Sequence, residues 1–205
     1  MQTLQPVAPP AAVSPLAAVF AQQRYVVVPG MIAPHEAAAL SEHMDGLDRD
    51  GQLIRTDEQV PQTPCTYGAI EMERLLGRLG PKMEFLTGLR LFPTYSFARI
   101  YKHGDVLKVH RDRAACEVSM SLNLGQEPED PWPLWLRTHE GQDVPVLLRP
   151  GDALVYRGIE LAHWREAYPG QRLAQVFLHY VDRNGPHAGQ IFDRRAGLGQ
   201  PLVTG

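Results

Sequence analysis

The second half of this chain is a close succession of short strand-like runs with no helical run between them. Turn-forming residues such as Gly, Pro and Asp separate the runs, which are rich in β-branched and aromatic residues. Strands joined without crossover helices pair antiparallel, and so many of them predict a sandwich, a barrel or a jelly roll. The runs, from about residue 91 onward, are TYSFARIY, VLKVH, EVSMSLNL, LWLRT, VPVLL, DALVY and RLAQVFLHYV.

The first half of the chain has helical periodicity instead. After a short apolar run, YVVV, a helix is predicted over residues 34–47, and it begins with Pro34, a residue suited to a first helical turn. Two further helical stretches, AIEMERLLGRL and KMEFLTGL, are separated by Gly80 and Pro81, which predict a break between them. Helices followed by an antiparallel sheet predict the α+β class.

Length and composition limit the possible kinds of protein. The chain has 205 residues, and we expect a flexible, Pro- and Ala-rich tail over residues 1–17 and a single domain over residues 18–205. The formal net charge of −3 gives no global reason to expect a nucleic-acid partner. The sequence shows neither an apolar run long enough to span a membrane nor a signal-peptide pattern, so the default expectation is a cytoplasmic protein. Cys65 and Cys116 are too few for a disulfide framework.

Three His-x-Asp triplets occur in the chain, and only one of them lies in strand-like sequence. His43 and Asp45 fall in the predicted helix, where residues two apart point to different faces. The triplet at residues 103–105 flanks a glycine and is typical of a turn. In LKVHRD, by contrast, His110 and Asp112 project from the same side of a strand, where both can bind one divalent metal.

A metal site of the facial type needs a third protein ligand, and His163 is the candidate. It lies between the strand DALVY and the last long strand. Arg172 opens that last strand, and alternation places it on a face with apolar residues. A buried guanidinium needs an anionic partner, and no acidic residue shares its face of the strand, so a small-molecule carboxylate is expected to bind it. The alternative is an arginine whose head reaches water from the strand end.

Together these segments resemble the prolyl 4-hydroxylase-like family of 2-oxoglutarate- and iron(II)-dependent oxygenases. YKHGDVLKVHRD is similar to the Tyr-x-x-Gly run that leads into the His-x-Asp motif of that family. GDALVY followed by HWREAYPGQR is similar to its strand, distal histidine and 2-oxoglutarate-binding arginine. The likeness covers about residues 92–182, with a looser one in RYVVVPGMIAPHEAAAL. The family fold is a double-stranded β-helix, a jelly roll with helices buttressing one sheet, which agrees with the succession of strands.

The resemblance implies an enzyme that uses iron(II), the cosubstrate 2-oxoglutarate and O2. It implies a dioxygenase that hydroxylates an unactivated C–H bond and releases succinate and CO2. The catalytic iron ligands that it assigns are His110, Asp112 and His163. The residues that it places around 2-oxoglutarate are Arg172, Tyr101 and Ser121.

The substrate suggested by the resemblance is a small molecule, an amino acid or a peptidyl residue such as proline. Candidate substrate contacts are Arg99, Arg111, Trp135 and Trp164. Two alternatives remain. One is a metal-binding jelly roll without turnover, acting as a sensor or an interaction module. The other is a nucleic-acid demethylase of the same superfamily, which the acidic charge balance disfavours.

Overall fold

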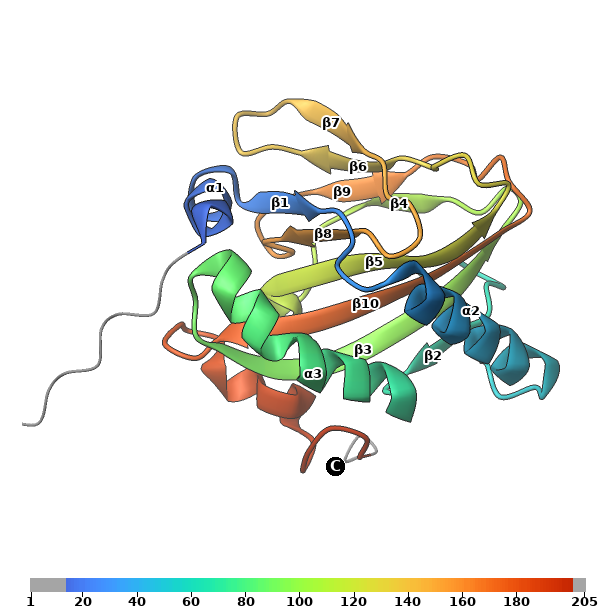
Figure 1. The fold of residues 1–205 in the computed structure, drawn as a ribbon, viewed down its shortest axis with the longest axis horizontal. Helices are drawn as coiled ribbons and strands as arrows, with labels where there is room; N and C mark the ends of the chain where they lie inside the picture. Colours follow the sequence, from blue (N-terminus) through green and yellow to red (C-terminus); the bar gives the residue numbers. More distant parts are fainter. Residues whose placement is uncertain (1–13, 201–205) are drawn as a thin grey trace, which may run out of the picture.

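Two antiparallel β-sheets form the body of the computed structural model, which describes residues 14–200 (Figure 1). The larger sheet has six strands in the order β1-β8-β5-β10-β3-β2, with the long strands β5, β10 and β3 side by side. Its strands are β1 (Tyr25–Val28), β2 (Cys65–Tyr67), β3 (Leu91–Lys102), β5 (Val118–Glu127), β8 (Ala153–Tyr156) and β10 (Arg172–Asp182).

The smaller sheet has four strands in the order β4-β9-β6-β7. Apolar side chains join it to the larger sheet: Leu134 and Leu136 of the smaller sheet cluster with Leu154 and Tyr156 of the larger. Two sheets that share one interior confirm the predicted jelly roll. The strands are β4 (Leu107–His110), β6 (Leu134–Arg137), β7 (Asp143–Val146) and β9 (His163–Arg165), and a short 3-10 turn, η1 (Ala114–Cys116), precedes β5.

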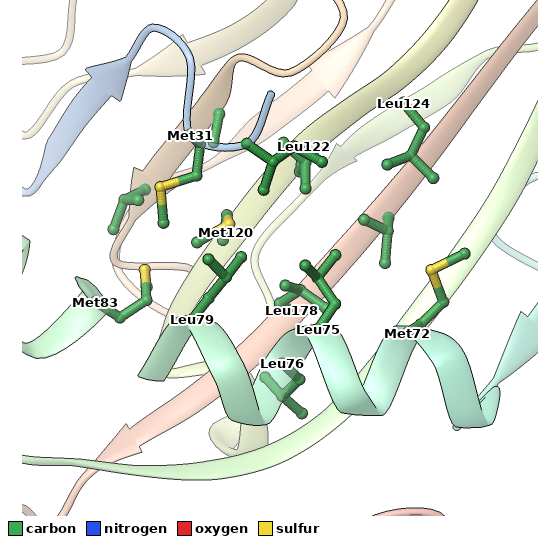
Figure 2. Packing of buried hydrophobic residues seen from close by; sticks show 14 of the residues in the cluster. Met31, Met72, Leu75, Leu76, Leu79, Met83, Met120, Leu122, Leu124 and Leu178 are labelled. Atoms are coloured by element: carbon green, nitrogen blue, oxygen red, sulfur yellow. The ribbon is translucent and has the colours of Figure 1, made fainter. Parts of the chain in front are cut away.

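Helices cover the face of the larger sheet that points away from the smaller one (Figure 1). Leu75 and Leu79 project from one helix onto Met120, Leu122 and Leu178 of the central strands (Figure 2). Burying one such side chain stabilises the fold by about 1.5 to 3 kcal/mol. None of the helices within residues 14–200 has the length and apolar character that crossing a membrane requires. The helices are α1 (Pro15–Gln23), α2 (Pro34–Arg49) and α3 (Ile70–Thr87).

Helix α3 runs without interruption through Gly80 and Pro81, so the predicted break is wrong. Proline lacks the N–H of an internal helical residue, and its presence in a helix interior costs about 3 kcal/mol. Leu79 before the proline and Met83 and Leu86 after it belong to one stripe buried against the sheet. The burial of this stripe on both sides of Pro81 offsets the cost and keeps the helix in one piece.

Three short elements escaped the sequence patterns. Strands β2 and β9 have three residues each, too few to show alternation. Helix α1 begins at Pro15, inside the segment that we expected to be a tail. Ser14 caps it by accepting from the backbone N–H of Leu16, and Phe20 anchors it in the core. The rest of that expected tail lies outside the described residues.

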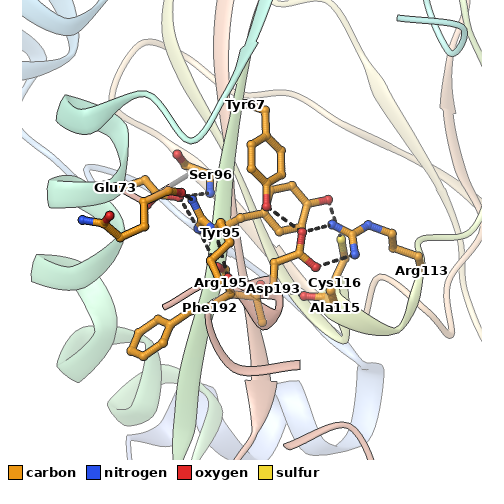
Figure 3. Close-up of polar contacts among 12 residues, drawn as sticks. Tyr67, Glu73, Tyr95, Ser96, Arg113, Ala115, Cys116, Phe192, Asp193 and Arg195 are labelled. Atoms are coloured by element: carbon orange, nitrogen blue, oxygen red, sulfur yellow. Dashed lines mark hydrogen bonds and ion pairs between the residues drawn. The ribbon is translucent and has the colours of Figure 1, made fainter. Parts of the chain in front are cut away.

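The chain after β10 returns to the larger sheet and is fastened by a buried ion pair. An irregular 3-10 segment, η2 (Ala188–Arg194), leads to Arg195, whose guanidinium donates to Oε1 of Glu73 on α3 at 2.6 Å (Figure 3). Both side chains are 1% exposed. Arg195 also donates to the carbonyl of Thr94 on β3 at 3.0 Å. The C-terminal segment is therefore tied to both a helix and a strand.

Candidate metal centre and adjoining cavity

The three predicted metal ligands lie together where the two sheets meet. His110 ends β4, His163 begins β9, and these two residues are cross-strand partners. Asp112 follows β4 by two residues, and its Oδ1 lies 3.7 Å from Nε2 of His110 and 3.6 Å from Nε2 of His163. Ligand atoms at such separations can share one metal ion.

Both imidazoles are oriented by the same kind of backbone contact. Nδ1 of His110 lies 2.9 Å from the carbonyl oxygen of Lys108, and Nδ1 of His163 lies 3.0 Å from that of Leu161. A carbonyl oxygen only accepts, so each Nδ1 carries the proton and each Nε2 keeps its lone pair, with the hydroxyl of Tyr156 lying 3.4 Å from Nε2 of His163. Burial lowers the pKa of His163, which further favours the neutral ring. Both rings are therefore in the form that binds a metal.

Asp112 is placed by the loop that follows β8. Its backbone N–H donates to the carbonyl of Gly158 at 3.0 Å. The glycine lies so close that a Cβ at position 158 would overlap Oδ2 of Asp112. Only a residue without a side chain fits there, and the carboxylate is confined from that side.

The candidate metal centre opens into a cavity of about 350 Å³, a volume within the range of small-molecule sites. Its walls combine aromatic rings with charged side chains. The aromatic residues are Tyr67, Tyr95, Phe97, Tyr156 and Phe177, and the charged ones outside the metal centre are Asp57, Arg111 and Arg113.

The aromatic wall is held by an aspartate from the C-terminal segment (Figure 3). Asp193 accepts two hydrogen bonds from Arg113, at 2.7 and 2.6 Å, and one from the hydroxyl of Tyr67 at 2.6 Å. Burial opposes the charge of Asp193, but the bonds from Arg113 and Tyr67 hold its pKa below the usual value. Arg113 covers the ring of Tyr95, which stacks on Tyr67. No sequence signal pointed to Asp193, because it is 80 residues from Arg113.

Arg172 does not face the metal centre, and the prediction that it binds a cosubstrate there is wrong. Its Nε donates to Oδ1 of Asp45 on α2 at 2.8 Å, and its Nη2 donates to Oγ of Ser41 at 2.9 Å. Its neighbours on the same face of β10, such as Ala174 and Val176, belong to the core under the helices. The acidic partner comes from a helix rather than from the strand, so the strand pattern gave no sign of it.

Arg165 is the arginine that does face the interior. It follows His163 by two residues on β9, and both are buried while the residue between them is not. Nη1 donates to the carbonyl of Trp132 at 2.6 Å and Nη2 to Oε1 of Gln175 at 2.8 Å, but Nε has no partner among residues 14–200. Burial lowers the pKa of Arg165 to about 10, so it is charged at neutral pH.

Arg165 is thus a buried cation, and no carboxylate of the described chain forms an ion pair with it. Sequence reasoning missed this residue, although the alternation in HWR places it on the same face as His163. A charge without a partner in a low-dielectric interior is costly, so this position favours an anionic ligand.

Tyr101 and Ser121 lie near Arg165 in the interior. The ring of Tyr101 is 5.8 Å from the guanidinium of Arg165, and its buried hydroxyl has no hydrogen-bond partner among the described residues. Oγ of Ser121 accepts a hydrogen bond from Gln175, the residue that also binds Arg165. Gln175 therefore links the guanidinium to the serine hydroxyl.

The two arginines proposed as substrate contacts differ in their exposure to solvent. Arg111 lines the cavity, and its Nε donates to the carbonyl of Glu160 at 3.0 Å, while much of the side chain faces water. Arg99 is buried, and its Nη2 donates to Oδ1 of Asp57 at 2.6 Å. Of these two arginines, Arg111 is the one that offers an accessible positive charge at the cavity.

Trp135 and Trp164 do not wall the cavity, so this part of the prediction is wrong. Their rings stack on each other with centroids 6.1 Å apart, on adjacent strands of the smaller sheet. The chain neighbours of both tryptophans are buried in the interior, and because strand side chains alternate, the two rings point outward.

The other two His-x-Asp triplets behave as predicted. His43 lies in α2, and Asp45 of that triplet pairs with Arg172. His103 and Asp105 flank a turn in which Asp105 accepts from the backbone N–H of Lys102 at 2.6 Å. Neither triplet belongs to a possible metal cluster within the described residues.

Both cysteines are free and buried, so neither forms a disulfide. Cys65 lies on β2, and its Sγ is 3.5 Å from the carbonyl oxygen of Ile54. Cys116 lines the cavity, and its Sγ lies 3.0 Å from the hydroxyl of Tyr95. Burial raises the pKa of the Cys116 thiol, so it is protonated at neutral pH in the metal-free protein. Together with Asp112 and His179 it forms a second group of possible ligand atoms.

Comparison with solved structures identifies the fold. No family model and no curated protein matches the sequence. A prolyl-4-hydroxylase from Pseudomonas putida is 20% identical, with a TM-score of 0.65 over 83% of this chain and 100% of that chain. The non-heme alpha ketoglutarate dependent epimerase SnoN from nogalamycin biosynthesis is 16% identical, with a TM-score of 0.71 over 92% of each chain. This chain has their fold.

A third solved structure supports the same conclusion. HygX from Streptomyces hygroscopicus, with nickel and 2-oxoglutarate bound, is 14% identical, with a TM-score of 0.64 over 84% of this chain and 89% of that chain. The predicted double-stranded β-helix with buttressing helices is confirmed, and so is the resemblance to these oxygenases at the level of the fold.

Proposed function

We propose that this double-stranded β-helix protein is an iron(II)- and 2-oxoglutarate-dependent dioxygenase with His110, Asp112 and His163 as its metal ligands. The observation that carries the proposal is the convergence of two imidazole lone pairs and one carboxylate oxygen beside a cavity. Two imidazoles and one carboxylate, with open positions left over, form the donor set of non-haem iron(II) oxygenases. Bound iron would supply the oxidation of an unactivated C–H bond by O2, with release of succinate and CO2.

Two buried polar groups in the interior near the proposed metal centre support a dicarboxylate as the cosubstrate. Nε of Arg165 and the hydroxyl of Tyr101 are buried and lack partners among the described residues. Leaving such a group unsatisfied costs about 1 to 3 kcal/mol, and a carboxylate would accept from both. We therefore assign Arg165, in place of Arg172, as the residue that holds the distal carboxylate of 2-oxoglutarate. Tyr101 and Ser121 keep the supporting role that the resemblance implies.

The cavity supports a small molecule, an amino acid or a peptidyl residue as the substrate. One wall is aromatic and suits a ring or an apolar group, and Arg111 offers a charge that suits an anionic group. Proteins with this fold have been solved with nogalamycin RO and with hygromycin B bound. Proline is one candidate, suggested by the likeness to a prolyl-4-hydroxylase.

Succinate formation tests the proposed activity. Purified protein in air with iron(II), ascorbate and 2-oxoglutarate is expected to form succinate slowly, and a substrate among amino acids, peptides and small metabolites is expected to accelerate it. His163→Ala should form none. His139→Ala, at an exposed turn, is the matched control and should be as active as the wild type. Metal binding without succinate under every condition would instead favour a jelly roll without turnover.

A further inference from the structure

A buried hydrogen-bond chain contacts Asp112 at Oδ2, the carboxylate oxygen that does not face the two histidines. Oγ of Ser119 lies 3.0 Å from Oδ2 of Asp112 and 2.9 Å from Nδ1 of His179. It also lies 3.1 Å from the carbonyl oxygen of Cys116. Ser119 is 0% exposed and His179 is 5% exposed, so both side chains are buried. Neither residue contributes to the metal or cosubstrate contacts proposed above.

The single proton of the Ser119 hydroxyl is best placed on Asp112. Three acceptors are within reach: the charged carboxylate of Asp112, the neutral carbonyl of Cys116 and, in one tautomer, Nδ1 of His179. Hydrogen bonds to a charged partner are roughly twice as strong, which favours Asp112. The serine oxygen is then free to accept from Nδ1 of His179, which carries a proton in one neutral tautomer. The chain runs from His179 through Ser119 to Asp112, with each group donating to the next.

The backbone holds this chain in place. Ser119 on β5 and His179 on β10 are cross-strand partners in the larger sheet. A register shift in the pairing of β10 with β3 falls between Leu178 and Tyr180, at His179 itself. Leu178 and Tyr180 both belong to the core under the helices, whereas His179 lines the cavity.

The two oxygens of Asp112 therefore have different surroundings. Oδ1 faces the Nε2 atoms of His110 and His163. Oδ2 accepts from Ser119 and is confined by Gly158. A carboxylate with one oxygen held in this way cannot turn to present both oxygens to a metal.

We infer that Ser119 and His179 are positioning residues, which hold Asp112 so that it binds the metal through Oδ1 alone. The inference rests on the proposed function, since it takes a metal between His110, Asp112 and His163. A carboxylate free to rotate could chelate with both oxygens and occupy one more coordination position. The hydrogen-bond chain keeps that position open for the cosubstrate or O2. Ser119 thus controls how many open positions the site offers.

Cobalt(II) binding in the absence of cosubstrate tests the role of Ser119, because visible cobalt bands report the coordination number. Ser119→Ala is expected to change the positions and lower the intensity of the cobalt bands, because a freed Asp112 adds a second oxygen ligand and raises the coordination number, and to change the cobalt affinity about tenfold or more. Ser96→Ala is the matched control. It also removes a buried hydroxyl from the same sheet, but that hydroxyl has no partner among the described residues. We expect this variant to bind cobalt as the wild type does.

A second pair of variants tests the role of His179. Asparagine places an amide N–H near the position of Nδ1, so His179→Asn should keep the donor to Ser119. Its affinity for cobalt should stay within a few-fold of the wild-type value. Leucine at this position removes the donor. His179→Leu should shift the cobalt spectrum in the same direction as Ser119→Ala. Circular dichroism checks that each variant is folded. If Ser119→Ala fails to fold, the two His179 variants decide the question.

The outcomes separate this inference from the proposed function. If folded Ser119→Ala binds cobalt with wild-type affinity and spectrum, the positioning role is wrong and the metal site stands. If the His179 variants do not differ from each other, the part played by His179 is wrong. If the wild-type protein binds no cobalt at all, the proposed metal centre fails and this inference fails with it.

Discussion

His110 and His163 lie opposite each other across β4 and β9, with ring centroids 4.2 Å apart. Each ring donates through Nδ1 to the carbonyl of the residue two positions earlier in the chain. Strand pairing and backbone acceptors therefore set the spacing and tautomer of both imidazoles, and the ring of Tyr156 packs edge-on against His163. Asp112, which lies beyond the end of β4, depends on side-chain and loop contacts for its orientation.

Replacing Arg165 or Arg172 by methionine tests which of the two arginines binds 2-oxoglutarate. Arg165 faces the interior of the jelly roll, and Arg172 faces the helices. Arg165→Met should raise the 2-oxoglutarate concentration needed for half-saturation about 30-fold or more, because truncating one partner of a buried charge pair costs roughly 2 to 5 kcal/mol. Iron affinity should stay the same. Titration of the iron-loaded protein with 2-oxoglutarate measures the effect.

Arg172→Met is the matched variant for that titration. Its guanidinium pairs with Asp45, whose side chain is 39% exposed, so its loss should lower the free energy of unfolding by about 1 kcal/mol. The requirement for 2-oxoglutarate should not change. If Arg172→Met needed more 2-oxoglutarate for half-saturation and Arg165→Met did not, Arg172 would be the residue that binds the cosubstrate.

A methyl group at position 158 should displace the carboxylate of Asp112, one of the proposed metal ligands. In Gly158→Ala the new Cβ overlaps Oδ2 of Asp112, so we expect metal affinity to fall at least about tenfold in calorimetric titration with nickel(II). Gly189→Ala adds the same methyl group where no atom lies within 4 Å, and should bind as the wild type does. Equal affinities in both variants would mean that Asp112 is not confined as described.

The stability of the metal-free protein should depend on His179 in acid. Burial lowers the pKa of His179 to about 4 in the folded state, against about 6.5 when unfolded. The unfolded chain therefore binds a proton that the folded chain does not. The contribution of neutral His179 to the free energy of unfolding is fully present above about pH 6.5. It falls by up to about 3 kcal/mol as the pH drops to about 4.

Urea unfolding with a chelator present, at several pH values between those two limits, measures this dependence. The stability advantage of the wild type over His179→Asn should shrink as the pH falls, because the variant lacks the titrating group. His139→Asn, at an exposed turn, should lose stability in parallel with the wild type. A constant difference between wild type and His179→Asn would refute the prediction.

The C-terminal segment should depend on one buried ion pair. Glu73→Ala leaves the guanidinium of Arg195 buried without its carboxylate, which should lower the free energy of unfolding by about 3 to 5 kcal/mol in urea. Glu71, two residues before Glu73, is an exposed ion-pair partner of Arg74. Glu71→Ala should lower the free energy of unfolding by less than about 1 kcal/mol. Similar losses in both variants would show that burial of the pair does not matter.

Local alternation was enough to predict most of the sheet and the proximity of two of the proposed ligands. The long runs from TYSFARIY to RLAQVFLHYV became strands, and His110 and Asp112 lie together as their spacing indicated. Alternation also grouped Arg172 correctly with Ala174 and its neighbours. It could not show which face of β10 looks inward, because helices supply apolar contacts on the other face.

The remaining differences come from contacts between distant parts of the chain. Pro81 stays inside α3 because the sheet buries the helix on both sides of it. Asp193 reaches Arg113, and Ser119 reaches His179, over 80 and 60 residues of sequence. Such pairs depend on strand order, which the sequence patterns did not determine.

The most direct test of the proposed iron(II) and 2-oxoglutarate site is an anaerobic titration of the protein with iron(II) and then 2-oxoglutarate, monitored by visible absorption. The account predicts a metal-to-ligand charge-transfer band that needs both additions and is absent in His163→Ala. It also predicts that Arg165→Met needs far more 2-oxoglutarate to develop the band. Iron binding without a band at any 2-oxoglutarate concentration would contradict the account and leave a metal-binding jelly roll without cosubstrate.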